Sequence, residues 1–163
     1  MESERFIRSS NTTCFAELSV DLPTPYNAYQ PSHADLLCNS YERWTGKSLI
    51  TEDFASASKA EYLFKAPFAL LSHHKPLQDP ILNYGNLTVL ELFGLSWDEL
   101  QQMPSRLTAE PQVRQERARL MKRVSDNGFI DDYSGVRISK SGKRFLIERA
   151  TVWNLIDSDG IYQ

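Results

Sequence analysis

The pattern of apolar and polar residues is clearest near the middle of the chain, where it predicts a strand followed by a short helix. An apolar run over residues 81–85 ends at Asn86. The Asn86 side-chain oxygen can accept a hydrogen bond from the free N–H of Thr88 or Val89, which makes it a good helix N-cap. The amphipathic segment that follows stops at Gly94, a residue suited to the left-handed conformation that ends a helix.

A second short helix is predicted immediately afterwards. Ser96 and Glu99 have the spacing of a capping box, in which each side chain accepts a hydrogen bond from the backbone N–H of the other residue. Leu95 precedes this cap and can pack against Leu100 as a hydrophobic staple. Two separately capped helices in so short a stretch must bend around something rather than run straight.

The remaining elements are predicted from the same periodicities and from turn residues. Leu37, Tyr41 and Trp44 lie at helical spacings, and Val136 and Ile138 alternate with polar neighbours as in a half-buried strand. This order predicts an α+β fold, with an antiparallel sheet built from two hairpins and helices packed on one face. The expected elements are a helix from a Ser32–Asp35 capping box to Gly46, a helix from Thr51 to about Phe64, strands at 67–72 and 81–85, the two short helices, a long helix at 111–127 ending at Gly128, strands at 133–139 and 144–156, and a turn at 157–160.

Size and charge exclude several partners. The chain has 163 residues and a net charge of −3, so no overall positive field attracts it to nucleic acid or to anionic lipid. Its longest apolar run, Ala66–Leu71, is far too short to span a membrane. Cys14 and Cys38 cannot form a disulfide framework or a four-ligand zinc site alone, so we expect two reduced thiols in the cytoplasm. A small basic cluster is interpreted as solvated turn charge and comprises Arg137, Lys140, Lys143 and Arg144.

Six stretches form an ordered set of motifs that, together with the residues between them, span about 66–160, most of the chain. They are APFALLSHH (66–74), DPILNYGNLTVLELFGLSWDEL (79–100), MPSR (103–106), ERARL (116–120), GFIDDYSGVRISKSGKRF (128–145) and IERATVWNLID (147–157). This set resembles the MEKHLA domain family, a PAS-like group found as stand-alone bacterial proteins and at the C-terminus of plant class III homeodomain–leucine zipper proteins. The resemblance implies a PAS-like domain at 66–163. Before it, the spacings described above predict N-terminal helices at 32–65, and the prolines among Ser, Thr and Asn at 1–31, without sustained periodicity, predict a loosely ordered extension.

The resemblance also implies a fifth strand, because similar proteins continue after the turn at 157–160 with a strand of small residues. Only Ile161, Tyr162 and Gln163 follow that turn in this sequence. We therefore expect a four-stranded antiparallel core whose last strand is absent or truncated. Its open edge would leave Leu155 more exposed and could pair with the N-terminal extension, a second subunit or further residues of the natural protein.

A ligand pocket is a further implication, because the pocket of a PAS-like fold is a hollow in its core. Aromatic residues, Tyr84 among them, can either line such a hollow or fill it. Arg106 can neutralise a ligand carboxylate or pair with Asp98, Asp131 or Asp132. The candidate ligand-binding residues are Phe68, Asn86, Leu90, Phe93, Trp97, Arg106, Tyr133 and Trp153.

Metal and cofactor chemistry have only weak signals. His73 and His74 would point to opposite faces of a regular strand, so a loop pair, or one histidine bound to the backbone, is the simpler interpretation. Light-sensing flavin domains of the PAS group need a cysteine after the first short helix, and residues 96–110 contain none. No motif places a nucleophile beside a base. We therefore expect no cofactor, no metal site and no catalysis.

Two functions are compatible with these observations. The first is a sensory module that binds a small apolar or acidic ligand. The second is a protein–protein interaction domain with a filled core, which forms a homodimer through its sheet or its N-terminal helices. A small enzyme that uses the hollow as an active site is a more distant third interpretation. Neither nucleic acid nor a membrane is an expected partner.

Overall fold

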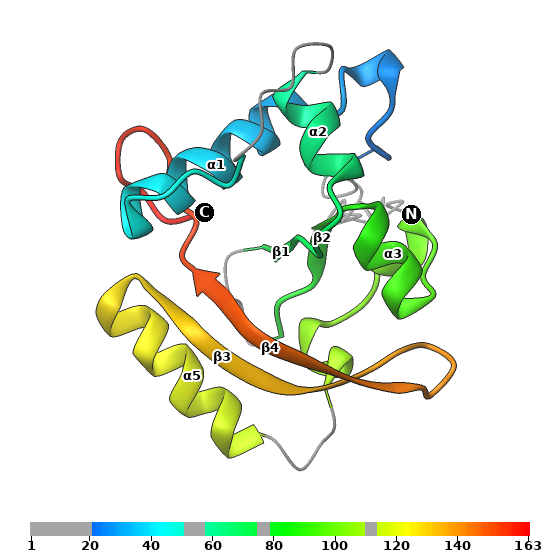
Figure 1. Cartoon of the computed structure of the whole chain (residues 1–163), viewed down its shortest axis with the longest axis vertical. Helices are drawn as coiled ribbons and strands as arrows, with labels where there is room; N and C mark the ends of the chain where they lie inside the picture. The colour runs from blue at the N-terminus through cyan, green and yellow to red at the C-terminus, as the bar shows by residue number, and fades with distance from the viewer. Residues whose placement is uncertain (1–20, 51–57, 75–78, 110–113) are drawn as a thin grey trace, which may run out of the picture.

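The computed structural model describes residues 21–50, 58–74, 79–109 and 114–163, and in these ranges the chain forms helices and two two-stranded sheets (Figure 1). The helices are η2 (Pro25–Asn27), α1 (Pro31–Thr45), α2 (Lys59–Lys65), α3 (Leu87–Phe93), α4 (Trp97–Leu100), η3 (Ser105–Thr108) and α5 (Arg114–Asn127). The strands are β1 (Leu71–His73), β2 (Leu82–Gly85), β3 (Phe129–Ile138) and β4 (Arg144–Trp153).

The four strands form two antiparallel hairpins. β1 pairs with β2, with Ser72 opposite Tyr84, and β3 pairs with β4, with Val136 opposite Leu146. In Figure 1 the β1–β2 hairpin lies between the layer of α1 and α2 and the long β3–β4 ribbon that carries α5. The predicted α+β class with antiparallel hairpins is confirmed. The prediction that all four strands join in one core sheet is wrong, because no described strand lies between β1 and β4 to connect the two pairs.

Two strands differ from their predicted boundaries. The first strand is reduced to Leu71–His73, because the residues before it are held in a loop by hydrogen bonds to the Asn86 side chain. β3 begins earlier than predicted, at Phe129, and its register shifts on both sides of Tyr133. Such irregularities change which side chains face inward. Val136 is consequently 42% exposed, although the alternation predicted it to be partly buried.

Near its beginning, α1 departs from the predicted cap. The helix begins at Pro31, and the preceding Gln30 has a left-handed conformation with φ of 59°. The predicted Ser32–Asp35 capping box is therefore wrong. Proline suits the first helical position because it has no N–H to leave unsatisfied, and this placement puts Ser32 inside the first turn. The predicted end at Gly46 is confirmed.

Two other predicted helix starts, Thr51 and Pro111, lie outside the described residues. The helix α2 has its N-cap at Ser58, whose hydroxyl accepts a hydrogen bond from the Glu61 N–H at 3.2 Å. The long helix α5 ends immediately before Gly128, as predicted.

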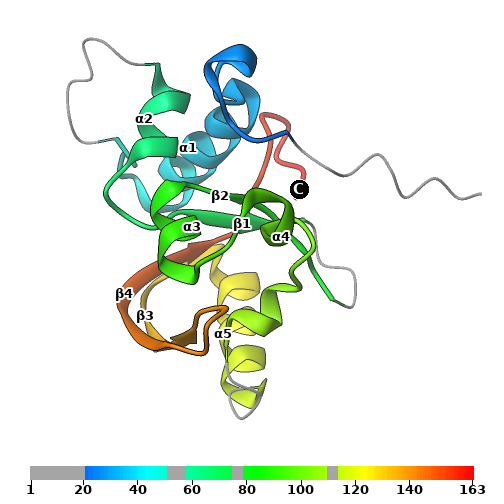
Figure 2. The same ribbon diagram turned by 90° about the vertical axis from the view of Figure 1, so that its right-hand side faces the viewer.

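Buried apolar side chains form three clusters. The largest, which we call the α1 cluster, connects α1 and α2 to β2 and α4; the second packs α3 and α4 against β2; the third packs α5 against β3. Figure 2 shows α3 and α4 on one side of the β1–β2 hairpin, with α1 and α2 above it. The buried members of the α1 cluster are Tyr29, Ala34, Leu37, Ala60, Leu63, Phe64, Leu70, Tyr84 and Trp97.

The segment after β4 runs back along α1. The Ser40 hydroxyl donates to the Ile156 carbonyl at 2.8 Å and accepts from the Ile156 N–H at 2.9 Å. Ile156 also forms a single bridge with Tyr162 across the turn predicted at 157–160, which is confirmed. Leu155 is partly buried against the α1 cluster. This segment therefore fixes the position of α1 over the core.

A tryptophan makes the second attachment of α1. Trp44 Nε1 donates to the Asn154 carbonyl at 2.9 Å, and Asn154 Nδ2 donates to the Val124 carbonyl at 3.1 Å. Gly128, with φ of 84°, lies against the Trp44 ring so closely that a Cβ atom there would be 2.2 Å from ring carbons. The ends of α1, α5 and β4 therefore meet at one joint.

Candidate ligand site beneath helix α1

The Asn86 side chain is hydrogen-bonded entirely within the protein. It is 0% exposed. The amide oxygen accepts from the N–H groups of Val89 at 3.2 Å and Leu70 at 3.1 Å, and the amide nitrogen donates to the carbonyls of Leu63 at 3.2 Å and Phe68 at 2.7 Å. The predicted helix cap is confirmed. All four hydrogen-bonding positions of the amide are used, so none is left for a ligand.

Tyr84 has a different environment, although it lies only two residues away on β2. Its side chain is 1% exposed, and its ring is 5.0 Å from the His33 ring and 6.1 Å from the Trp97 ring, measured between centroids. Within the described part of the chain, the Tyr84 hydroxyl has no hydrogen-bond partner. Burial also raises the pKa of this hydroxyl well above its usual range.

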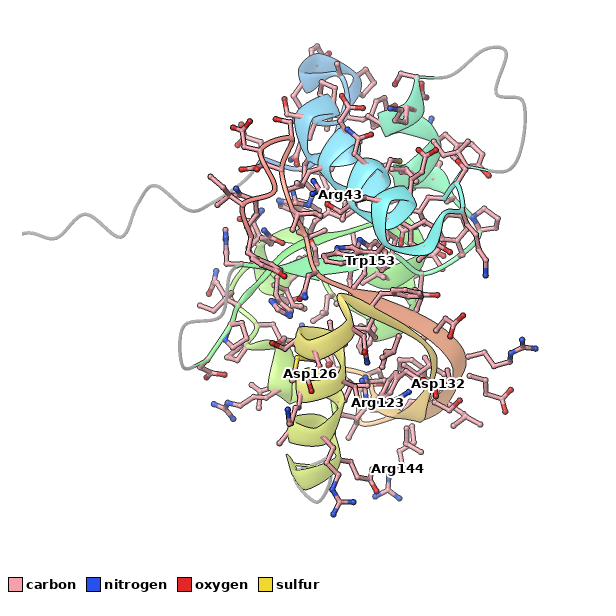
Figure 3. The ribbon with its side chains drawn as sticks, turned by 90° about the vertical axis from the view of Figure 1, so that its left-hand side faces the viewer. Arg43, Arg123, Asp126, Asp132, Arg144 and Trp153 are labelled. Carbon is pink, nitrogen blue, oxygen red and sulfur yellow. The ribbon has the colours of Figure 1, made fainter. Side chains whose placement is uncertain are left out.

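Trp153, the last residue of β4, also has a buried polar atom without a hydrogen-bond partner in the described part of the chain. This atom is the indole nitrogen Nε1. The indole ring makes an edge-to-face contact with Tyr41 of α1, with centroids 5.0 Å apart. Figure 3 shows Trp153 directly beneath α1.

Cys38 belongs to the same region of the core. It lies one turn before Tyr41 on α1 and packs against the α1 cluster, as Trp153 does. Tyr84 is a buried member of that cluster, and Tyr41 contacts Trp153. We call Tyr84, Cys38, Tyr41 and Trp153 the α1 row.

Titratable groups beside the α1 row are held in their neutral forms. Burial, followed by the neighbouring charge of His74, lowers the pKa of His33 to about 4. The His33 Nε2 atom lies 3.0 Å from the Ser72 hydroxyl, which itself donates to Asn83 Oδ1 at 2.7 Å. Burial also raises the pKa of the Cys38 thiol. These groups are poor acids and bases near neutral pH.

The predicted ligand residues are distributed over all three clusters. Phe68, Leu90, Trp97 and Trp153 contact the α1 cluster, and Leu90 also contacts the second cluster. Phe93 belongs to the second cluster, where its ring packs edge-to-face on Phe145 at 5.0 Å. Tyr133 packs in the third cluster and also contacts the Arg137 guanidinium.

Arg106 lies apart from all of them. It is exposed on η3, and its Nε atom is 3.0 Å from each carboxylate oxygen of Asp79. The predicted pairing with Asp98, Asp131 or Asp132 is therefore wrong, because the partner is Asp79, in the segment that leads into β2. The carboxylate that Arg106 neutralises is thus one of the protein's own.

Sequence reasoning missed His33, Tyr41 and Cys38 as site residues. All three lie on α1, and the helical spacing of Tyr41 with its apolar neighbours indicated only a packed face. Tyr84 was recognisable as an aromatic candidate. Its unpartnered hydroxyl depends on the position of α1, which no local pattern contains.

Two other predicted features are explained by local contacts. His73 Nδ1 lies 2.8 Å from the His74 carbonyl, so one histidine is bound to the backbone, as expected. The Lys140 ammonium forms an ion pair with Glu99, and its backbone N–H donates to the Phe93 carbonyl at 2.9 Å. The hydrogen bond from Lys140, followed by those from Ser96, lowers the pKa of Glu99 to about 2. The basic β3–β4 turn therefore joins the hairpin to α3 and α4.

Among the described residues, no group of three or more histidine, cysteine, aspartate or glutamate side chains is arranged to hold a metal ion. A search of the same residues finds no helix with the length and apolar character needed to cross a membrane.

Solved structures of similar fold are photoreceptor and PAS domains. A cysteine-to-serine mutant of Vivid, a fungal blue-light photoreceptor, matches with a TM-score of 0.51 and 19% identity over 78% of this chain and 93% of that chain. A Vivid variant with two isoleucines replaced by valine matches with a TM-score of 0.50 and 16% identity over 78% and 87%. A PAS domain from Colwellia psychrerythraea has a TM-score of 0.47 and 14% identity over 58% and 75%. The two Vivid structures, with TM-scores of 0.50 and 0.51, show the fold alone, which is α+β and PAS-like.

The family is more specific than the fold. The chain belongs to the MEKHLA domain family, whose model matches residues 31–163. A curated relative, Homeobox-leucine zipper protein HOX29 of Oryza sativa subsp. indica, is 26% identical over 164 residues. That alignment covers 98% of this chain, and the chain spans only 18% of the length of the rice protein.

Proposed function

We propose that this chain is a sensory module that binds a small molecule beneath α1 and has no catalytic chemistry of its own. One observation carries the proposal: Tyr84 Oη and Trp153 Nε1 are both buried without a partner in the described structure. A buried polar group left unsatisfied costs about 1–3 kcal/mol, so two of them in one apolar region are an expensive feature for a purely structural core. A bound molecule would satisfy both.

The attachment of α1 supports a sensory role. The helix is held over the α1 row by Ser40 at Ile156 and by Trp44 at Asn154. A ligand in contact with Cys38 or Tyr41 would alter the free energy of these attachments, and ligand binding can shift a conformation only through such differential contacts. In this proposal the helices of residues 32–65 cover the domain formed by residues 66–163.

The absence of catalysis in the proposal rests on the acid–base properties of the site. General acid–base catalysts have pKa values near the working pH. Near the α1 row the pKa of His33 is lowered to about 4, whereas those of Cys38 and Tyr84 are raised. Environments of this kind suit a binding site better than a proton-transfer site.

Native mass spectrometry of the protein purified without denaturation tests the proposal. We expect a population whose mass exceeds that of the bare chain by one small molecule, and a smaller such population for Tyr84→Phe. Tyr133→Phe removes the same hydroxyl from a different cluster and serves as the matched control. Equal occupancy in the wild type and both variants, or bare chain in every preparation, would contradict the proposal.

A second candidate function is homodimerisation through the outer face of the β3–β4 ribbon. Val136 and Leu146 lie opposite each other and are 42% and 58% exposed. Arg144 and Glu148 flank Leu146 on the same face of β4, since side chains alternate along a strand. A two-fold axis through Leu146 would place each arginine near the partner's glutamate. Sedimentation of the wild type and Leu146→Lys tests this, with a concentration-dependent dimer expected only for the wild type.

A further inference from the structure

We infer that the molecule bound by the α1 row is neutral and presents hydrogen-bond acceptor atoms to Tyr84 and Trp153. This inference rests on the proposed function, and it specifies the chemical class of the ligand. It replaces the acidic ligand that Arg106 suggested, because that arginine is exposed and already paired with Asp79.

The first argument concerns hydrogen-bonding complementarity. An indole N–H can only donate, and a phenol hydroxyl donates readily. The Trp153 nitrogen therefore requires an acceptor, such as a carbonyl, ether or ring nitrogen of the ligand. An acceptor on the same molecule would also satisfy Tyr84, which is 1% exposed and has no alternative partner in the described structure.

The second argument concerns charge. The buried polar side chains of the described residues are all uncharged: Ser40, Ser72, Asn86, Ser105 and Thr108. The charged groups that act on Cys38 are Lys59, Asp35 and Glu42, and the one cation among them, Lys59, is already paired with Asp35 in an exposed ion pair 2.7 Å long. An anion beneath α1 would therefore lose its hydration without gaining a positive partner, which is a large cost in an apolar interior.

A cation is disfavoured by the same groups. The hydrogens of the Trp153 N–H and the Tyr84 O–H carry partial positive charge toward any group that they bind. The His33 ring lies 5.0 Å from the Tyr84 ring, between centroids, and burial lowers the pKa of His33 to about 4, so its imidazole is neutral near neutral pH and apolar surroundings disfavour a second cation there.

The third argument concerns shape. Aromatic rings from three elements border the site, namely Tyr41 of α1, Trp97 of α4 and Trp153 of β4. Aromatic side chains favour edge-to-face or offset packing against another ring. A flat, unsaturated molecule with a carbonyl oxygen therefore matches both the walls and the donors.

A pair of related probes separates neutral from acidic ligands. Coumarin is flat and neutral and has a lactone carbonyl, whereas coumarin-3-carboxylate adds one negative charge to the same ring system. Binding of each is measured by saturation-transfer NMR and by titration, using the full chain. We expect coumarin to bind at least about tenfold more tightly than its carboxylate, because burial of the unpaired charge opposes binding.

Single hydroxyl and indole deletions localise the site. Tyr84→Phe and Trp153→Phe should each weaken coumarin binding about three- to tenfold, as loss of one hydrogen bond predicts. Tyr133→Phe should leave the affinity unchanged. The midpoint of thermal unfolding without probe should not fall in Tyr84→Phe, because that substitution removes a buried hydroxyl that has no partner. This second measurement separates a lost ligand contact from a damaged fold.

The outcomes distinguish the inference from the proposed function. If the carboxylate binds as tightly as coumarin and Tyr84→Phe weakens both, the ligand site stands and its preference for a neutral molecule is refuted. If neither compound binds at millimolar concentration, or if Tyr133→Phe weakens binding as much as Tyr84→Phe does, both the inference and the proposed site are overturned.

Discussion

Replacement of Asn86 provides the sharpest test of how this fold is held together. The Asn86 amide forms four hydrogen bonds that connect α2, the loop before β1 and the first turn of α3, and it is completely buried. A net value of about 0.5–1.5 kcal/mol for each bond, with further costs for the carbonyls and N–H groups left unpaired, gives a loss of about 3–5 kcal/mol for Asn86→Ala. Loss of a helix cap alone would cost only about 1 kcal/mol.

The aspartate variant makes the test more decisive. As a helix cap, Asp is about as effective as Asn, so the sequence alone predicts a mild effect of Asn86→Asp. In the structure, one oxygen of the new carboxylate would face the carbonyls of Leu63 and Phe68, which need donors. A buried charge without a positive partner adds to this repulsion. We therefore expect Asn86→Asp to lose at least about 3 kcal/mol, as much as the alanine variant.

Urea unfolding followed by tryptophan fluorescence measures both losses. Ser96→Ala is the matched control, because Ser96 caps α4 through one exposed hydrogen bond to the Glu99 N–H at 3.3 Å, and it should cost about 1 kcal/mol. The reasoning is refuted if Asn86→Asp is as stable as the wild type, or if Asn86→Ala costs no more than the Ser96 control.

Three further predictions concern acid sensitivity, the α1 joint and partners. His33 has a pKa of about 4 when folded and an ordinary value of 6.5 when unfolded, so the unfolded chain binds a proton first as pH falls. The contribution of His33 to the free energy of unfolding should therefore be fully present above about pH 6.5 and should fall by at most about 3 kcal/mol toward pH 4. In urea titrations at several pH values, His33→Gln should make the free energy of unfolding less dependent on pH, whereas the control His73→Gln should not. In the same assay, Gly128→Ala should destabilise the protein by at least about 2 kcal/mol more than Gly142→Ala, because both glycines have positive φ but only Gly128 contacts Trp44. Equal losses would contradict the close packing of Gly128 on Trp44 where α1, α5 and β4 meet. At near-physiological salt the chain should show no specific duplex DNA binding by fluorescence anisotropy, given its net charge of −3, and sub-micromolar binding would refute this.

Features that depend on a few neighbouring residues could be predicted from the sequence. Asn86 bonds to the Val89 N–H, and Ser96 and Glu99 form a reciprocal capping box, as their spacing indicated. The failed cap at Ser32 belongs to the same local scale. There, Pro31 is the stronger signal, since proline favours the first helical position.

Contacts between distant segments could not be predicted in this way. Arg106 pairs with Asp79, which is 27 positions away, and Trp44 donates to Asn154 across 110 positions. Residue spacing contains no information about which of several acidic residues folding will bring to an arginine. The unpartnered state of Tyr84 and Trp153 is of this kind, because it depends on how α1 and β4 pack together.

The β3–β4 hairpin could be predicted from the sequence only in part. The positions of two strands near the C-terminus followed from their alternation and from the turn between them. The register shifts on both sides of Tyr133 did not, and they determine that Val136 faces outward. Irregular pairing responds to packing against the rest of the domain, which an alternating pattern does not record.

The most direct test of the account follows the Trp153 indole N–H during titration with coumarin. The chain has three tryptophans, and single phenylalanine variants assign their indole signals in a proton–nitrogen correlation spectrum. The Trp44 N–H is already bonded to the Asn154 carbonyl, so its signal reports on the attachment of α1 and not on a new ligand contact. We predict that the Trp153 proton moves downfield as its nitrogen gains an acceptor, and that Tyr84→Phe weakens the response. A bound probe that leaves the Trp153 signal in place would contradict the ligand site beneath α1.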